Sequence, residues 1–423
     1  MNIALTNRCS RRCAFCYQGD VMDHAQAAGS GDMSLEALRK LLEFAEANGE
    51  PKVTLVGGEP TLHHEFDAVL ELFDASPVIQ QVLLFTNGLF AASTLETIVA
   101  HGRKLLVCVN VLSPTEENPK FLERLHENLT EFVRRNIHFD LSFVIHRPDF
   151  DYEFLVDYVD RYHVGGVRWA LAFPVVPGAA FVARDDLIKV GPRIVAMLRA
   201  LETRGTRSYV DCPLPYCLFD DASLGYISRQ ALSVINWGTC GLTLEINPDL
   251  TVKACPSQRE EERVPLASFA NMSEMEQYFF GRMSAYRGAH RLFDHCVDCH
   301  YYKQGRCQGG CLSYSREAFV DEVPKATVQT FRIGEIPSSW RVRPLPHVSV
   351  WSENGQRVLG SGVSSDVKPE PLSERTDAYW NVLASGPKFG EAVSRFSPEH
   401  TEPLRAFVRR LQRIGLIDLV AEN

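Results

Sequence analysis

Between residue 34 and about residue 200, continuous apolar stretches alternate with segments whose apolar residues recur every three or four positions. The continuous stretches predict buried strands at 53–56, 82–85, 105–111, 139–145 and 167–173. The first intervening helix is expected to begin after Ser34 and to end at Gly49, with Leu38, Leu41, Leu42 and Ala45 on one face. This alternation is typical of an α/β protein with a mainly parallel sheet, either open or barrel-like.

The pattern changes after about residue 205. Periodicity weakens up to about residue 325 while Cys, Pro and Gly become frequent, which predicts a loop-rich domain organised by metal. Two short strands at 347–351 and 356–360, a final helix at 402–414 and a strand at 416–420 resemble a small winged-helix unit. We therefore expect domains at 1–204, 205–328 and 346–423, with a linker at 329–345.

Length and charge narrow the class of protein. The chain has 423 residues, enough for two or three domains, and 53 acidic against 44 basic residues argue against a general nucleic-acid binder. No apolar run approaches the roughly 20 residues of a membrane span. The first residues lack the basic and then apolar pattern of a signal peptide. We expect a cytoplasmic protein without a membrane or nucleic-acid partner.

Twelve cysteines are many for such a protein, because a reducing compartment disfavours structural disulfides. Three of them, Cys9, Cys13 and Cys16, lie in the run NRCSRRCAFCYQG with C-x3-C-x2-C spacing. Three thiolates can hold three irons of a four-iron cluster and leave the fourth iron open. A structural zinc site usually has four ligands, so zinc is the weaker alternative.

The three cysteines and the sequence Gly57-Gly58-Glu59-Pro60, which follows a predicted strand, together resemble the radical S-adenosylmethionine (SAM) superfamily. The resemblance covers residues 3 to about 175. It implies that Gly57, Gly58 and Glu59 contact the amino group of SAM, with Phe15 before the last cysteine and Asn110 as further cofactor-binding residues. Glycines permit close backbone approach, and a carboxylate suits an ammonium group.

A second group of cysteines resembles the SPASM extension of radical SAM enzymes, which carries auxiliary iron–sulfur clusters. It comprises Cys240, Cys255, Cys296, Cys299, Cys307 and Cys311. The resemblance implies that Cys240, Cys255 and Cys311 serve an inner cluster and the other three an outer one. Two features depart from the family pattern: Leu250 stands where a glycine is common, and no cysteine follows Cys311.

Counting the cysteines suggests how the ligand sets are completed. Cys108 lies in an apolar strand and is expected in the core. Without it and the first three, eight remain, which is enough for two four-ligand clusters if Cys212 and Cys217 take part. A single auxiliary cluster and a zinc ribbon at 296–311 are the alternatives.

Other polar residues give weaker signals. His63 and His64 follow the glycine-rich segment, while His295 and His300 flank cysteines and are more often packing or exposed residues. Asp211 and Tyr216 fall near the expected substrate side, but no catalytic acid or base can be chosen from the sequence.

The C-terminal unit allows two functional interpretations and one neutral one. Arginines on the final helix would suit DNA, although a solvated helix face is the commoner explanation and the chain is acidic. The element order and the run FVRRLQRIGLIDLV resemble the RiPP recognition element, in which a strand edge captures an extended leader peptide. A capping domain without a ligand is the neutral interpretation.

Taken together, the resemblances imply a partial (β/α)6 TIM-like barrel, a loop-rich iron–sulfur domain and a small winged-helix-like α+β domain. The implied protein is a radical SAM/SPASM peptide maturase, an oxidoreductase. It would use a SAM-binding 4Fe-4S cluster, one or two auxiliary 4Fe-4S clusters (two favoured) and SAM. A 5′-deoxyadenosyl radical would take hydrogen from a ribosomally made precursor peptide and install an oxidative modification such as a crosslink.

The expected partners are a precursor peptide with a leader segment and an external reductant such as flavodoxin or ferredoxin. Three other functions stay open. They are a dehydrogenase or epimerase acting on a small metabolite such as a sugar or nucleoside, an enzyme that matures a folded protein, and a non-catalytic electron-transfer protein.

Overall fold

The computed structural model divides into two compact units, Met1–Asn236 with Leu242–Met272 and Trp237–Gly241 with Ser273–Asn423. Each unit is described by itself. The structure describes the chain apart from residues 20–21, 23–30, 175–178, 220–222, 224–225, 228–232, 235–240, 256–257, 259–261, 290–292, 294–295, 297, 300–301, 303–306, 318–335, 346–347, 354, 362–368, 414–415 and 421–423.

The first unit is built on one sheet with the order β11-β10-β9-β1-β2-β3-β4-β5-β6-β7-β8. From β9 through β1 to β8 all neighbouring strands are parallel, and β10 and β11 extend the sheet antiparallel beyond β9. The bounds are β1 (Asn2–Thr6), β2 (Lys52–Gly57), β3 (Gln81–Thr86), β4 (Leu105–Asn110), β5 (Phe139–Ile145), β6 (Gly166–Leu171), β7 (Arg207–Val210), β8 (Ser233–Val234), β9 (Glu245–Ile246), β10 (Thr251–Lys253) and β11 (Val264–Pro265).

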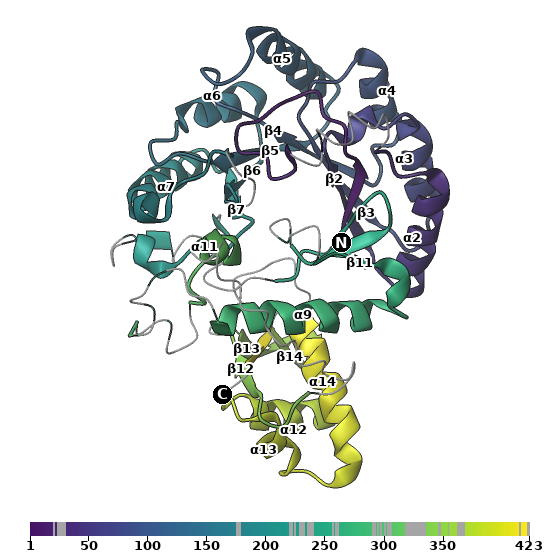
Figure 1. The fold of residues 1–423 in the computed structure, drawn as a ribbon, viewed down its shortest axis with the longest axis vertical. Coiled ribbons are helices and arrows are strands. Elements are labelled where there is room, and N and C mark those ends of the chain that lie inside the picture. The colour runs from purple at the N-terminus through teal and green to yellow at the C-terminus, as the bar shows by residue number, and fades with distance from the viewer. Residues whose placement is uncertain are drawn as a thin grey trace. The chain divides into compact units, whose positions relative to one another are not determined.

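Helices form the outer layer of this sheet (Figure 1). They are α2 (Leu35–Ala47), α3 (Phe66–Ala75), α4 (Ala92–Ala100), α5 (Pro119–Arg134), α6 (Glu153–Tyr162) and α7 (Leu187–Glu202). The helix expected after Ser34 is confirmed: the Ser34 side chain accepts a hydrogen bond from the N–H of Ala37, and Leu38, Leu41, Leu42 and Ala45 are buried. The α/β fold is thus confirmed, and within the described residues the sheet does not close into a barrel.

Strand β1 lies inside the sheet, between β9 and β2, although the sequence pattern did not single it out. Its neighbours are β2 and β9, and Leu5 and Ala4 are fully buried. It is short and runs directly into the cysteine loop. Its position places that loop at the carboxyl ends of the parallel strands, where sites in such folds gather.

The second unit contains helix α9 (Met272–Ala289, with Met272 counted in the first unit), α11 (Leu312–Glu317) and a C-terminal body. Helix α9 falls in the segment expected to be rich in loops. Its polar and apolar residues do not form a single stripe, as in MSEMEQYFFGRMSAYRGA, so periodicity gave no signal for it.

The C-terminal body has two small sheets and three helices. The pair β12 (Arg341–Pro344) and β16 (Ile417–Val420) is antiparallel, and β13 (Val348–Glu353), β14 (Gln356–Ser361) and β15 (Glu370–Pro371) form an antiparallel sheet in that order. Helices α12 (Glu374–Leu383), α13 (Phe389–Val393) and α14 (Thr401–Arg413) pack with them. The expected strands and final helix are present. Residues 341–344, expected in the linker, instead form β12, whose Val342 is fully buried.

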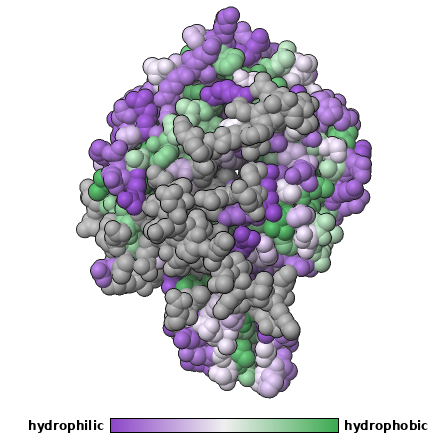
Figure 2. Space-filling model, in the orientation of Figure 1, coloured by the Kyte–Doolittle hydropathy of each residue, from purple (hydrophilic) through white to green (hydrophobic). Residues whose placement is uncertain are grey.

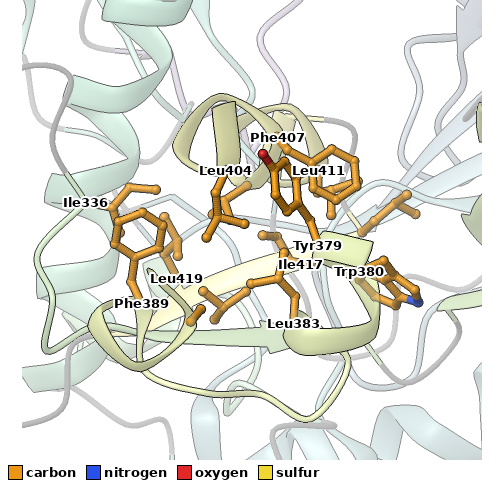
Figure 3. Close-up of a cluster of buried hydrophobic side chains, with 14 of the residues drawn as sticks. Ile336, Tyr379, Trp380, Leu383, Phe389, Leu404, Phe407, Leu411, Ile417 and Leu419 are labelled. Carbon is orange, nitrogen blue, oxygen red and sulfur yellow. The ribbon is translucent and has the colours of Figure 1, made fainter. Parts of the chain in front are cut away.

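The core of this body is apolar and continuous. Leu404, Val408 and Leu411 of α14 are fully buried, and they pack with Tyr379 and Trp380 of α12 and with Ile417 of β16 (Figure 3). The C-terminal body therefore has a hydrophobic core of its own.

The exposed surface of the described residues is ordinary. Large exposed hydrophobic side chains include Val99, Leu106, Val133 and Ile188. Hydrophilic residues are prominent on the face drawn in Figure 2. None of the helices that the structure describes is both long enough and apolar enough to cross a membrane.

Candidate active site

The three cysteines lie on the loop that follows β1. The N–H of Cys16 bonds to the carbonyl of Cys13 at 3.1 Å, which closes the loop into a turn, and all three side chains are half-buried. The pKa of Cys13 is raised to about 12, mainly by burial; the Arg11 charge opposes this shift, and the nearby Cys16 and Cys9 contribute to it. The three thiols are thus close enough to interact electrostatically.

Their spacing distinguishes a cluster from a single ion. Three thiolates bound to one zinc ion at about 2.3 Å would lie within roughly 4 Å of one another. Among the described residues, only Asp32, His63 and His64 bring three ligand atoms within 4.8 Å of one another. The wider cysteine triad therefore fits a four-iron cluster held by three thiolates better than it fits zinc.

Gly57 and Gly58 are required by the close approach of the cysteine loop. A Cβ on Gly57 would lie 2.4 Å from the carbonyl oxygen of Thr6, and one on Gly58 would lie 2.2 Å from that of Arg8. The N–H groups of Gly58 and Glu59 donate to these same two carbonyls, each at 2.7 Å. The glycine pair thus allows the end of β2 to hold the start of the cluster loop.

Glu59 is buried, with 2% of its surface exposed. Its Oε1 accepts hydrogen bonds from the hydroxyls of Thr61 and Thr86, both at 2.7 Å, and from the Thr61 N–H at 3.2 Å. Its Oε2 accepts from the N–H of Asn87 at 2.6 Å. Burial raises the pKa of Glu59, and these four donors oppose that shift.

The resemblance assigns Glu59 to the SAM amino group, and the structure shows which neighbours hold its carboxylate. In the structure the Glu59 carboxylate joins the carboxyl ends of β2 and β3, and the Asn87 side chain continues the connection to the cluster loop. Its Nδ2 lies 3.1 Å from Ser10 Oγ and 3.9 Å from Cys9 Sγ. Glu59 is therefore a positioning residue for the loop.

Arg11 is the main site residue that the sequence argument missed. It lies between Cys9 and Cys13 with only 3% of its side chain exposed, and its Nη2 is 2.6 Å from Glu117 Oε2, also 3% exposed. The guanidinium donates to the carbonyls of Asn110 at 2.9 Å and Asn87 at 3.3 Å. Nothing in the run NRCSRRC separates Arg11 from its exposed neighbour Arg12.

Phe15 and Asn110, expected near SAM, lie beside the ends of the next strands. The Phe15 ring packs against His146 with ring centroids 4.9 Å apart, just beyond β5. Asn110 ends β4, and its Nδ2 lies 3.5 Å from Ser142 Oγ of β5. All the expected cofactor-binding residues thus gather at one edge of the sheet around the cysteine loop.

Asp32, His63 and His64 form a bracing group rather than an ion site. Asp32 accepts hydrogen bonds from Thr6 Oγ1 at 2.5 Å and from Arg8 Nη2 at 2.6 Å. His63 Nε2 lies 2.7 Å from the Met33 carbonyl, and its Nδ1 accepts from the N–H of Glu65. Although burial raises the pKa of Asp32, its bonds with Arg8, Thr6 and His64 hold it well below its usual range.

The remaining cysteines are distributed over both units. In the first unit Cys212 and Cys217 follow β7, and Cys255 follows β10. In the second unit Cys296, Cys307 and Cys311 are buried, and the N–H of Gly309 lies 3.4 Å from Cys307 Sγ. Cys108 is fully buried in β4, as expected. Cys240, His295 and His300 lie outside the described residues.

The backbone conformation of Leu250 shows why the family pattern commonly has a glycine at this position. It has φ = 61°, in the left-handed region, at the turn between β9 and β10. A glycine adopts this conformation without cost, whereas a side chain strains it.

Asp211 forms a salt bridge with Arg168 of β6, with 2.6 Å between Oδ1 and Nη2. Burial raises the pKa of Asp211, and the guanidinium opposes the shift. Tyr216 begins a 3-10 turn, Tyr216–Leu218.

Comparison with known proteins supports this site. Residues 3–142 match the family model of the radical SAM superfamily. That segment includes the cysteine triad, the glycine pair, Glu59 and Asn110, so the chain contains a radical SAM domain. Radical SAM enzymes cleave SAM reductively at a 4Fe-4S cluster, and the residues of this loop fit such a cluster.

Curated relatives match up to half of the chain. A GTP 3′,8-cyclase of Clostridium perfringens strain SM101 is 21% identical over 225 residues, which are 50% of this chain and 68% of the relative. A GTP 3′,8-cyclase of Aeromonas hydrophila is 32% identical over 90 residues, 21% of this chain and 26% of the relative.

Solved structures match more of the chain. SuiB of Streptococcus suis bound to S-adenosylmethionine has a TM-score of 0.52 at 15% identity, covering 78% of this chain and 76% of SuiB. SuiB bound to its precursor peptide SuiA gives 0.51 at 15% identity over 78% and 75%. The enzyme anSMEcpe with bound AdoMet and the Cp18Cys peptide gives 0.53 at 17% identity over 73% and 88%. At these identities the likeness establishes a shared fold.

Proposed function

We propose that the chain is a radical SAM peptide maturase, an oxidoreductase that modifies a ribosomally made precursor peptide. When bound, the triad cluster and SAM supply a 5′-deoxyadenosyl radical that takes a hydrogen atom from the substrate. The chain's own residues position this chemistry. The glycine pair and Glu59 support the cluster loop, and Phe15 and Asn110 lie beside it.

The observation that carries the peptide proposal is the C-terminal body. Its three-stranded sheet has the order β13-β14-β15, so β13 and β15 are edge strands in the described part of the chain. An edge strand offers unpaired N–H and carbonyl groups to an extended peptide. This body also has its own core, so it can present such an edge as a stable module.

A pocket in the same body supplies a place for a peptide side chain. Its volume is about 970 Å³, and it lies between α12, α14 and the turn before α14. Tyr379, Phe396 and Phe407 supply aromatic surface, and Arg375 and Arg409 supply positive charge. A strand edge with a neighbouring pocket is the usual combination for peptide recognition, since the edge gives affinity and the pocket gives specificity.

We also propose that eight cysteines hold two auxiliary 4Fe-4S clusters. They are Cys212, Cys217, Cys240, Cys255, Cys296, Cys299, Cys307 and Cys311. Burial of three of them and the N–H of Gly309 directed at Cys307 Sγ suit cluster sulfurs, whose potentials depend on such bonds. About twelve irons per chain are expected; about four would overturn this assignment.

The relatives named GTP 3′,8-cyclase favour a second candidate, a radical SAM enzyme acting on a small metabolite such as a nucleoside or sugar. Their match covers half of this chain, whereas the SuiB and anSMEcpe structures match about three quarters of it. The edge strands and the pocket of the C-terminal body are the reason to prefer a peptide, with an external reductant such as flavodoxin or ferredoxin as the electron source.

The experiment screens short peptides translated from the reading frames beside this chain's gene, each labelled with a fluorophore and titrated with the full-length protein. Ala406→Trp fills the pocket from an exposed position on α14, and Asn381→Trp places the same side chain on α12 outside the pocket. Ala406→Trp should weaken binding at least tenfold and Asn381→Trp should leave it unchanged. Equal affinity of all three proteins, or turnover of a free small molecule without any peptide, would contradict the proposal.

A further inference from the structure

Arg11 and Glu117 form a buried ion pair beside the cysteine loop. Both side chains of this ion pair are 3% exposed, which makes it one of two fully buried pairs in the described residues, together with Lys253–Glu245. Two charges withdrawn from water interact strongly and are costly to separate. A pair at this place therefore needs a reason beyond ordinary stability.

The pair lies next to the cluster ligands. Arg11 is two residues from Cys9 and two from Cys13, and its backbone N–H is 3.5 Å from Cys9 Sγ. The guanidinium of Arg11 meets Glu117 at 2.6 Å, so both charges lie beside the cysteine loop. Whatever occupies the triad will sense the same two charges.

Arg11 and Glu117 make different sets of contacts. Arg11 also donates to the carbonyls of Asn87 and Asn110, at the ends of β3 and β4, so it anchors the loop through neutral groups as well. Glu117 lies on the segment between β4 and α5, and its ion pair is with Arg11. Removing the Glu117 charge should thus leave the anchors of the loop in place.

We propose that Glu117 offsets the charge of Arg11 and thereby prevents that charge from raising the reduction potential of the cluster held by Cys9, Cys13 and Cys16. Reduction adds one electron to the cluster, so nearby positive charge favours the reduced form and nearby negative charge opposes it. The paired guanidinium and carboxylate nearly cancel. Arg11 can therefore hold the loop with its positively charged side chain without raising the reduction potential of the cluster, which would make the reduced cluster a weaker reductant.

The test measures the midpoint potential of the triad cluster by EPR-monitored redox titration of the reconstituted full-length protein, without any peptide. Glu117→Gln keeps the size and hydrogen bonding of the side chain but leaves Arg11 unbalanced, so the potential should rise. Arg11→Gln leaves Glu117 unbalanced, so the potential should fall. The double variant, neutral at both positions, should return close to the parent.

Arg12→Gln is the matched control, because it removes the same charge from an exposed position of the same loop. Water screens that charge, so its shift should be much smaller than that of Arg11→Gln. The proposal would be overturned if the midpoint potential shifted in the same direction in both single variants. It would also be overturned if the potential of the double variant differed from the parent as much as that of either single variant. A double variant that loses the cluster while Glu117→Gln keeps both the cluster and the parent potential would overturn it as well, because Arg11 would then serve only to hold the loop.

This inference rests on the radical SAM domain and not on the identity of the substrate. A parent protein that fails to modify any peptide could still show the opposite shifts. The potentials and the peptide titration therefore fail independently.

Discussion

Replacing Gly58 by alanine tests how the glycine pair supports the cluster loop. The new Cβ would lie 2.2 Å from the carbonyl oxygen of Arg8 and 2.6 Å from its carbonyl carbon, and both are backbone atoms that no side-chain rotation can move. Relief requires the two segments to separate by about 1 Å. That movement stretches the 2.7 Å hydrogen bond between the Glu59 N–H and the Arg8 carbonyl beyond bonding distance.

Overpacking against backbone costs about 1–3 kcal/mol, and a lost buried hydrogen bond adds about 1 kcal/mol. We therefore expect Gly58→Ala to lower the free energy of unfolding of the first unit by about 3 kcal/mol. The cysteine loop begins at the displaced segment, so the SAM-responsive EPR signal of the reduced, reconstituted protein should also fall sharply.

Gly165→Ala is the control, because nothing lies within 4 Å of its added Cβ and its φ is outside the left-handed region. It should keep both the parent stability and the EPR signal. A Gly58→Ala protein with parent stability and a full SAM-responsive signal would refute the argument from close approach.

Three further predictions concern stability. His101 lies 2.7 Å from Asp74 and 3.3 Å from Asp67, and although burial lowers its pKa these carboxylates raise it above 6.5 overall. Its stabilisation is therefore fully present below pH 6.5 and is lost as the pH rises through the raised pKa. The difference in unfolding free energy between the parent and His101→Gln should be larger at pH 6 than at pH 9; a difference independent of pH would contradict this. Gly281→Ala, on α9 with open space around the added Cβ, should stabilise that helix by about 0.5–1 kcal/mol in urea denaturation, and a loss of stability would count against the helix assignment. Leu411→Ala, fully buried in the C-terminal core, should cost about 2–5 kcal/mol and raise hydrogen exchange in α14, whereas unchanged exchange would argue against the packing in Figure 3.

Much of the fold was predictable because its signals are local. The apolar strands β2 to β6 and the capped helix α2 follow from periodicity and capping residues, and the structure places them within about two residues of the expected bounds. Helix α9 was not predictable in this way, since its apolar residues do not repeat on one face. Strand β12 was missed because it lies in a proline-containing segment, and only its pairing with β16 identifies it.

The site was predictable as a set of motifs but not as a set of contacts. Spacing identifies Cys9, Cys13 and Cys16, and the two glycines are explained by the approach of the cysteine loop. The function of Glu59 was not visible, because its donors come from residues up to 28 positions away. Arg11 was missed for the same reason, since its partner Glu117 is distant in sequence and only burial separates it from Arg12.

The most direct test of the proposed function follows the hydrogen atom. The reconstituted protein is incubated anaerobically with dithionite, SAM and the deuterated precursor peptide. The deuterium content of the 5′-deoxyadenosine formed is then measured by mass spectrometry. The account predicts that one deuterium from the peptide appears in 5′-deoxyadenosine while the peptide acquires an oxidative modification. Formation of 5′-deoxyadenosine without deuterium, beside an unmodified peptide, would contradict it.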